Sequence, residues 1–275
     1  MRFIRKYFLK HSKKLETASG KGAVCRVCYG ILGTAILILL WALTGYVLFS
    51  RPGYEQFSGF LPIPTVKALY LLLLDIDFWG SVCASLRRVV VGILIAFLVG
   101  LPSGLLIGYY GKLRLATDAP IQFLRMVSPL AWMPIALLVF RTFESAICFL
   151  ITMATVWPII LNTTVGVSHV NSQWINMARD QGAKDRHLIF RIILPSSMPY
   201  ILTSLRLALG VAWIVLVPAE FLGVSSGLGY LINDARDTME YDRLMAVVVS
   251  IGILGFVLDG IIQLIRERFK WTWVS

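Results

Sequence analysis

The chain has 275 residues, of which 57% are hydrophobic, and its mean hydropathy is +0.76. Soluble domains are closer to half apolar, and here the excess forms runs of roughly twenty residues, long enough to cross a hydrocarbon core. Uninterrupted apolar runs exclude the alternating pattern of a β-barrel, so we expect an all-α membrane protein. The net charge is +11, and the basic residues cluster between these runs. This pattern indicates orientation in the membrane and contact with its lipids, not nucleic-acid binding.

The N-terminal segment, residues 1–27, is a basic arm that we expect on the cytoplasmic surface. A cleaved signal peptide is the alternative, but the apolar run that follows, residues 29–49, is too long and lacks a convincing cleavage site. That run is the first predicted span. Cys25 and Cys28 form a C-x-x-C pair with no second ligand pair, so reduced thiols or an acylation site are favoured over a metal or redox role.

Residues 50–80 mix proline, glycine and acidic residues, and we place them outside the membrane. Their apolar stretch at 66–74 is too short to span, which indicates an interfacial or packed helix that starts at Pro62 and Pro64. The chain is therefore divided into the arm 1–27, the first span with its outer segment 28–80, and a core 81–270.

The second predicted span, residues 82–110, carries a glycine stripe. Its members recur at intervals of four or eight and share one helix face: Gly92, Gly100, Gly104 and Gly108. Small residues let helices approach closely, so packing is the favoured role and ligand contact the minor alternative.

Four more apolar runs predict four further spans, at 121–140, 145–167, 198–221 and 244–265, about six in all. Pro129 and Pro134 break the third, and non-helical backbone at membrane depth is tolerated where it lines a cavity. Trp132 between them is equally compatible with a gate and with an interfacial anchor. With the N-terminus inside, nine Lys or Arg fall in the inner segments after the arm and five in the outer ones, which predicts two cytoplasmic termini.

The polar segment between the fourth and fifth spans contains the most specific pattern. Residues 176–181 favour a helix, Gly182 suits a tight turn or helix end, and 184–190 can form further helical turns that Pro195 would end. Two short helices at an angle make a protruding knob, which suits a cleft on a soluble partner. An amphipathic interfacial helix is the alternative.

This segment resembles the EAA loop of binding-protein-dependent ABC transporter permeases, whose pattern is E-A-A-x-x-x-G-x9-I-x-L-P. Gly182 is followed by nine residues and then by Ile-Ile-Leu-Pro, while Asn176 and Met177 replace the first two residues of the pattern. The resemblance implies an ABC importer (type I) fold with a coupling helix in the loop 171–195. It also implies contact with an ATPase through Ala178, Gly182, Ala183, Ile192, Leu194 and Pro195.

The resemblance covers roughly residues 80–270. The stretches 125–134, 157–163, 212–223 and 227–230 are similar to motifs of the nitrate, taurine, alkanesulfonate and bicarbonate branch. It implies a permease that carries a small oxyanion or organosulfonate. Related permeases carry thiamine precursors or aromatic carboxylates, which remain alternatives, and a secondary transporter is the rival class.

Polar and bulky groups within the spans are the candidates for the translocation pathway or its gate: Ser128, Pro129, Trp132, Trp157, Asn162, Thr163 and Glu220. A carboxylate near hydrocarbon usually pairs, so an ion pair is favoured for Glu220 over substrate contact. Arg206 is about 21 Å away along the same helix, too far to pair with it. Arg88 and Arg125, on other spans, are the possible partners.

The chain carries no nucleophile–base constellation, no metal-ligand spacing around its three histidines and no G-x-x-x-x-G-K-[ST] loop for ATP phosphates. We therefore expect neither an enzyme nor a bound cofactor. The resemblance implies ATP and Mg²⁺ on a partner ATPase, a second permease copy in a homodimer, a periplasmic or lipid-anchored substrate-binding protein, and a bacterial inner membrane location.

Overall fold

A computed structural model describes residues 21–49, 53–221 and 223–271, and these residues form helices joined by short turns. Residues 1–20 of the predicted basic arm lie outside the described residues. Within the described residues, five helices are long and apolar enough to cross a membrane. A sixth span is counted if one sharply bent helix pair is taken as a single crossing. The all-α membrane fold is confirmed.

The chain divides into two compact units, and the first is Met1–Ala68. Its long helix α2 (Lys21–Phe49) contains the first predicted span, and the short 3-10 helix η1 (Glu55–Phe60) follows. The indole Nε1 of Trp41 donates a hydrogen bond to the Phe60 carbonyl at 3.0 Å, which holds η1 against α2. Helix α3 (Pro62–Leu74) begins at Pro62 as predicted, since proline at the first helical position loses no hydrogen bond.

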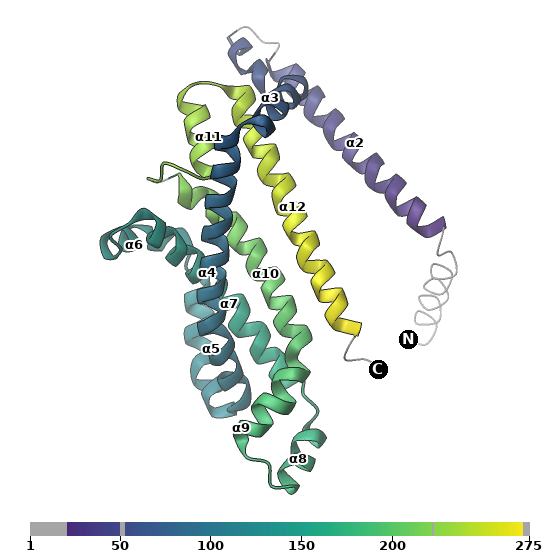
Figure 1. Cartoon of the computed structure of the whole chain (residues 1–275), viewed down its shortest axis with the longest axis vertical. Coiled ribbons are helices and arrows are strands. Elements are labelled where there is room, and N and C mark those ends of the chain that lie inside the picture. Colours follow the sequence, from purple (N-terminus) through teal and green to yellow (C-terminus); the bar gives the residue numbers. More distant parts are fainter. Residues whose placement is uncertain (1–20, 50–52, 222, 272–275) are drawn as a thin grey trace. The chain divides into compact units, whose positions relative to one another are not determined.

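The second unit, Leu69–Ser275, is built around helix α7 (Phe143–Ser168), the most buried of the apolar helices. Helices α4 (Ile76–Tyr109) and α10 (Leu194–Glu220) both pack along it (Figure 1). Its buried Leu150 and Ile151 join Val89 of α4 and Leu216 of α10 in one apolar cluster. The predicted second, fourth and fifth spans correspond to α4, α7 and α10, each a few residues longer than expected.

The glycine stripe of α4 lies against α7 and confirms the packing role. A Cβ at Gly92 would lie 2.6 Å from the Ile151 side chain, and one at Gly104 would lie 2.7 Å from Cβ of Thr163. A hydroxyl of α7 also donates a hydrogen bond to a backbone carbonyl of α4: Thr164 Oγ1 donates to Gly104 O at 3.2 Å. The two backbones therefore approach so closely that no side chain fits between them at these positions.

The predicted third span is not a single helix. Helix α5 (Gly111–Met126) and the segment formed by η2 (Pro129–Trp132) and α6 (Met133–Val139) meet at 85°. Val127 and Ser128 are extended between them. Ser128 is so because a residue that precedes proline is pushed out of the helical region. Residues 111–120, between the second and third predicted spans, form the first turns of α5.

Helix α11 (Leu228–Asp237) was not predicted, because its many polar residues hide the apolar side that it buries. It packs against α12 (Tyr241–Trp271), the helix that contains the sixth predicted span, and against α4 and α10. Leu228 and Ala235 are fully buried there. In Figure 1 α11 lies at the end of α10 opposite to the short helices α8 and α9.

Candidate functional site

The predicted knob contains α8 (Ser172–Asp180) and α9 (Asp185–Leu188), and we call residues 172–190 the coupling knob. Two backbone hydrogen bonds close the turn between the helices: Gly182 N to Arg179 O at 2.8 Å, and Ala183 N to Ala178 O at 3.0 Å. This is the Schellman arrangement, which places a glycine in the left-handed region. Gly182 has φ +79°, and the predicted helix end at this glycine is confirmed.

The base of the coupling knob is held by an apolar cluster. Leu188 and Ile193 are fully buried and pack with Leu105 of α4 and Val167 of α7. The predicted coupling residues Ala178, Ala183, Ile192 and Leu194 pack against this cluster and are partly buried. Most of the predicted coupling residues therefore hold the knob in place, and Gly182 is exposed at its turn.

A polar contact ties both knob helices to α4. The Tyr109 hydroxyl donates to Oδ1 of Asp185 at 2.6 Å and accepts from Nη2 of Arg179 at 3.1 Å. The hydrogen bond to Tyr109 raises the pKa of Arg179 above its ordinary value. The knob is thus linked to α4 by packing and by hydrogen bonds.

The exposed apolar surface of the knob was missed by the sequence reasoning. Trp174, Met177 and Phe190 are 54%, 61% and 59% exposed. Trp174 and Met177 are three residues apart on α8, a spacing that puts them on one helix face and could have indicated a contact surface. Met177 is one of the two residues that depart from the EAA pattern, and it lies on this exposed surface.

The coupling knob continues into α10 without a break, and Pro195 does not end the helix as expected. A π-helical turn, Ile189–Ile193, joins α9 to α10, and Pro195 lies in the first turn of α10. The wider turn ends with the hydrogen bond from Leu194 N to Ile189 O, which shifts the carbonyl pattern at the point where Pro195 lacks a donor. Asp185–Glu220 is consequently one helical segment of 36 residues.

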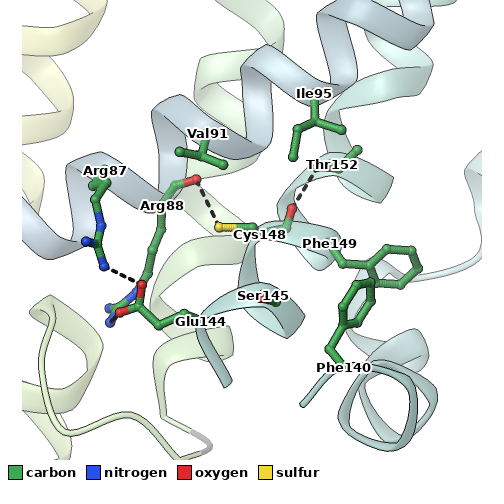
Figure 2. A pocket seen from close by; sticks show the side chains of 10 residues that line it. All are labelled: Arg87, Arg88, Val91, Ile95, Phe140, Glu144, Ser145, Cys148, Phe149 and Thr152. Carbon is green, nitrogen blue, oxygen red and sulfur yellow. Dashed lines mark hydrogen bonds and ion pairs between the residues drawn. The ribbon is translucent and has the colours of Figure 1, made fainter. Parts of the chain in front are cut away.

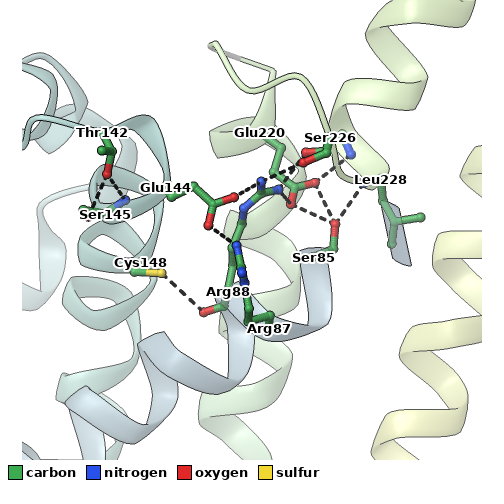
Figure 3. Close-up of polar contacts among 11 residues, drawn as sticks. Ser85, Arg87, Arg88, Thr142, Glu144, Ser145, Cys148, Glu220, Ser226 and Leu228 are labelled. Atoms are coloured by element: carbon green, nitrogen blue, oxygen red, sulfur yellow. Dashed lines mark hydrogen bonds and ion pairs between the residues drawn. The ribbon is translucent and has the colours of Figure 1, made fainter. Parts of the chain in front are cut away.

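The far end of this segment lies in a buried ion-pair cluster (Figure 3). Nη1 of Arg88, on α4, is 2.6 Å from Oε1 of Glu220, and both side chains are almost completely buried. Nη2 of Arg88 is 2.6 Å from Oε1 of Glu144, the second residue of α7. One guanidinium therefore joins α4, α7 and α10, which makes Arg88 the partner of Glu220.

The remaining acceptor capacity of Glu220 is also satisfied. The Ser85 hydroxyl donates to the carboxylate at 2.8 Å, and Gly229 N donates to Oε2 at 2.8 Å. Gly227 allows the chain to pass over the pair: its φ is +124°, and a Cβ there would lie 2.6 Å from both Arg88 and Glu220. Ser85, Arg88, Glu144 and Glu220 are called the ion-pair cluster below.

A cavity of about 500 Å³ opens beside the ion-pair cluster, between α4 and α7 (Figure 2). Arg87, Arg88 and Glu144 line one side of it, and Phe140 and Phe149 line the other. Arg87, unlike its neighbour, has an exposed side chain, and it also pairs with Glu144. The cavity therefore places an exposed charge next to a buried one.

The predicted pathway residues do not form one group in the single chain. Ser128 and Pro129 lie at the 85° break, and Trp132 packs there against the cluster around Ala212 and Leu216. On α7, Trp157 is partly buried, Asn162 donates to the Pro158 carbonyl at 2.8 Å, and Thr163 is fully buried against Gly104. Only Glu220 belongs to the ion-pair cluster.

Residues 88–271 match the family described as binding-protein-dependent transport system inner membrane component. The nitrate import permease protein NrtB of Leptolyngbya laminosa is 35% identical over 216 residues, covering 75% of this chain and 77% of that protein. The bicarbonate transport system permease protein CmpB of Synechocystis sp. is 34% identical over 247 residues, covering 87% of this chain and 86% of that protein.

A solved structure of the MetNI methionine ABC transporter, in inward-facing conformations, has the same fold. It matches with a TM-score of 0.58 and 17% identity, over 72% of this chain and 94% of the other. The knob, the arrangement of α4, α7 and α10, and the sequence matches agree with one another. The chain belongs to the binding-protein-dependent transport system inner membrane component family, and it is a non-catalytic membrane subunit of an ABC importer.

Proposed function

We propose that this subunit carries a small oxyanion or organosulfonate, such as nitrate, bicarbonate or taurine, into the cytoplasm. The relatives whose names specify nitrate and bicarbonate cover three quarters or more of the chain. The basic inner segments support an orientation with both termini in the cytoplasm of a bacterial inner membrane. ATP and Mg²⁺ are bound by a partner ATPase, and a substrate-binding protein delivers the solute from outside.

The observation that carries the coupling proposal is the single helical segment from Asp185 to Glu220. One of its ends is in the coupling knob, which offers Trp174, Met177 and Phe190 to a cleft of the ATPase. Its other end is fixed to α4 and α7 by the ion-pair cluster. A movement of the ATPase is therefore transmitted along α10. It shifts the helices from one packed arrangement to another.

Two copies of the chain are proposed to form the pathway, each docked on one ATPase. Reconstituted with its ATPase and binding protein, the transporter is expected to take up labelled nitrate, bicarbonate or taurine only when ATP is present. Uptake that is equally fast without ATP would show a secondary transporter instead. ATP-dependent uptake of a thiamine precursor or an aromatic carboxylate, with none of the three anions, would contradict the proposed substrate class.

The turn of the coupling knob gives a separate prediction. Gly182→Val is expected to insert normally but to lose coupling, because a β-branched residue at φ +79° costs about 1–2 kcal/mol and displaces the end of α8. The measurement compares ATP hydrolysis with uptake in proteoliposomes. Gly182→Asn is the matched control, since asparagine tolerates the left-handed region and should keep most of the coupling. Wild-type uptake by the valine variant would rule out a coupling role for this turn.

A further inference from the structure

Arg206 of α10 and Asp259 of α12 form an ion pair that has no part in the sites described above. Nε of Arg206 donates to Oδ1 of Asp259 at 2.7 Å, and Nη2 donates to Oδ2 at 2.6 Å, so the contact is bidentate. The two side chains are 34% and 43% exposed, in contrast to the buried pair of Arg88 and Glu220. Nη1 of Arg206 donates to no other residue in the described part of the chain.

The pair lies near the middle of both helices. Arg206 is about 18 Å from the start of α10 at Leu194 and about 21 Å from its end at Glu220, at 1.5 Å per residue. Asp259 is about 18 Å from the end of α12 at Trp271 by the same measure. Because a hydrocarbon core is about 30 Å thick, both charges lie at membrane depth.

Charged side chains at this depth face the interior of a bundle or a water-filled cavity, because exposure to lipid is costly. About a third of the Arg206 side chain is nevertheless uncovered in the single chain. This surface therefore meets water or protein in the assembled transporter. No local pattern predicts the pair, since Arg206 and Asp259 are 53 residues apart and belong to different spans.

The same face of α10 carries one hydroxyl-bearing and one small residue beside the apolar Leu202 and Leu209. Thr203 and Gly210 are three residues before and four residues after Arg206, which places them on its side of the helix. Gly210 is exposed, and a Cβ there would meet nothing within 4 Å. The structure thus leaves open space at Gly210, one helical turn from Arg206.

We propose that Arg206 is the residue that an anion contacts within the translocation pathway, with Asp259 as the counter-ion that it exchanges against the solute. The inference deepens the proposed function and rests on it for the identity of the solute. A guanidinium presents a planar fork of donors that matches nitrate, bicarbonate and sulfonate oxygens. Since Asp259 already neutralises this charge, the anion is held only weakly, as a conducting pathway requires.

The test uses a thiol at Gly210 in the complete transporter, with the four native cysteines replaced. Gly210→Cys is reacted in membrane vesicles with methanethiosulfonate reagents of equal size, one carrying a sulfonate and one a trimethylammonium group. We expect the anionic reagent to react faster. Arg206→Gln should lower the anionic-to-cationic rate ratio about tenfold, which corresponds to about 1.4 kcal/mol. Nitrate, bicarbonate or taurine should slow the anionic reagent in the variant with Arg206.

Two further variants separate a pathway role from a purely structural one. Asp259→Asn should raise the same rate ratio, an effect of opposite sign that misfolding does not produce. Gly80→Cys, at the start of α4 and also with open space at its Cβ, is the matched control. Its rate ratio should be the same with Arg206 and with Arg206→Gln, because the two positions belong to distant parts of their helices.

The inference is overturned if the ratio at Gly210→Cys does not depend on Arg206. It is also overturned if this thiol reacts with neither reagent and instead forms a disulfide between two copies, because the face would then be a subunit contact. Failure of the proposed function would give a different result. If the proposed substrate class is wrong, the wild-type transporter would take up a neutral solute, while the dependence of the rate ratio on Arg206 would persist.

Discussion

Arg88→Met is expected to lower the unfolding free energy by about 3 kcal/mol, because it leaves the carboxylate of Glu220 buried without its counter-ion. For a domain of this size the melting temperature should fall by roughly 10 °C. The same guanidinium joins α4, α7 and α10, so its removal weakens the contacts among all three helices. The measurement is thermal unfolding of the purified chain in detergent, together with its abundance in membranes.

The neighbouring residue provides the control. Arg87 lies on the same helix and pairs with the same Glu144, but its side chain is 65% exposed. Exposed ion pairs contribute about 0–1 kcal/mol, so Arg87→Met should change stability little. Glu220→Gln added to Arg88→Met should restore part of the loss, since it removes the unpaired charge. Equal destabilisation by the Arg87 and Arg88 variants would show that burial of the pair is not what matters.

Gly104→Ala is expected to destabilise the chain by about 1–3 kcal/mol through overpacking of α4 against α7. The added Cβ would lie 2.7 Å from Cβ of Thr163 and 2.8 Å from the Ile160 carbonyl oxygen, and neither neighbour is the flexible end of a side chain. The two helices would have to separate. Thermal unfolding in detergent measures the effect. The effect should be larger because a separation of the helices at Gly104 also weakens the contacts of Gly100 and Gly108 with α7.

A glycine at the other end of the same helix gives the opposite expectation. A Cβ at Gly80 would meet nothing within 4 Å. Gly80→Ala should therefore stabilise the chain by about 0.5–1 kcal/mol, the difference in helix propensity between the two residues. If both alanine variants shift the melting temperature in the same direction, close packing is not the reason for the glycine stripe.

The coupling knob shows what a local pattern can predict. The polar segment, the helix at 176–181 and the turn at Gly182 follow from residue types alone, because a left-handed helix end favours glycine. The fate of Pro195 could not be predicted in the same way. The π turn that keeps the helix continuous is held by Leu188 and Ile193 buried against other helices, and such packing is not visible in a local pattern.

The ion-pair cluster shows the limit for contacts between distant residues. The cost of a buried charge predicts that Glu220 is paired, and it leaves both Arg88 and Arg125 as partners. The choice depends on which helices meet, and Arg125 lies exposed in the last turn of α5. The prolines predict a break in the third span, though not its angle of 85°. Helix α11 was missed for a related reason. Its polar residues are typical of a loop, while the burial of Leu228 and Ala235 stabilises helical turns there.

The glycine stripe of α4 has a mechanical consequence. Each of its four glycines contacts a side chain of α7. The two helices therefore cannot slide by one residue without a steric clash. Helices α4 and α7 therefore form a stationary frame, and any rearrangement of the subunit has to occur around them. Among the described residues, the sharply bent junction of α5 and α6 carries no such interlock. Cross-links placed between α4 and α7 should leave transport intact, whereas cross-links across the junction of α5 and α6 should arrest it.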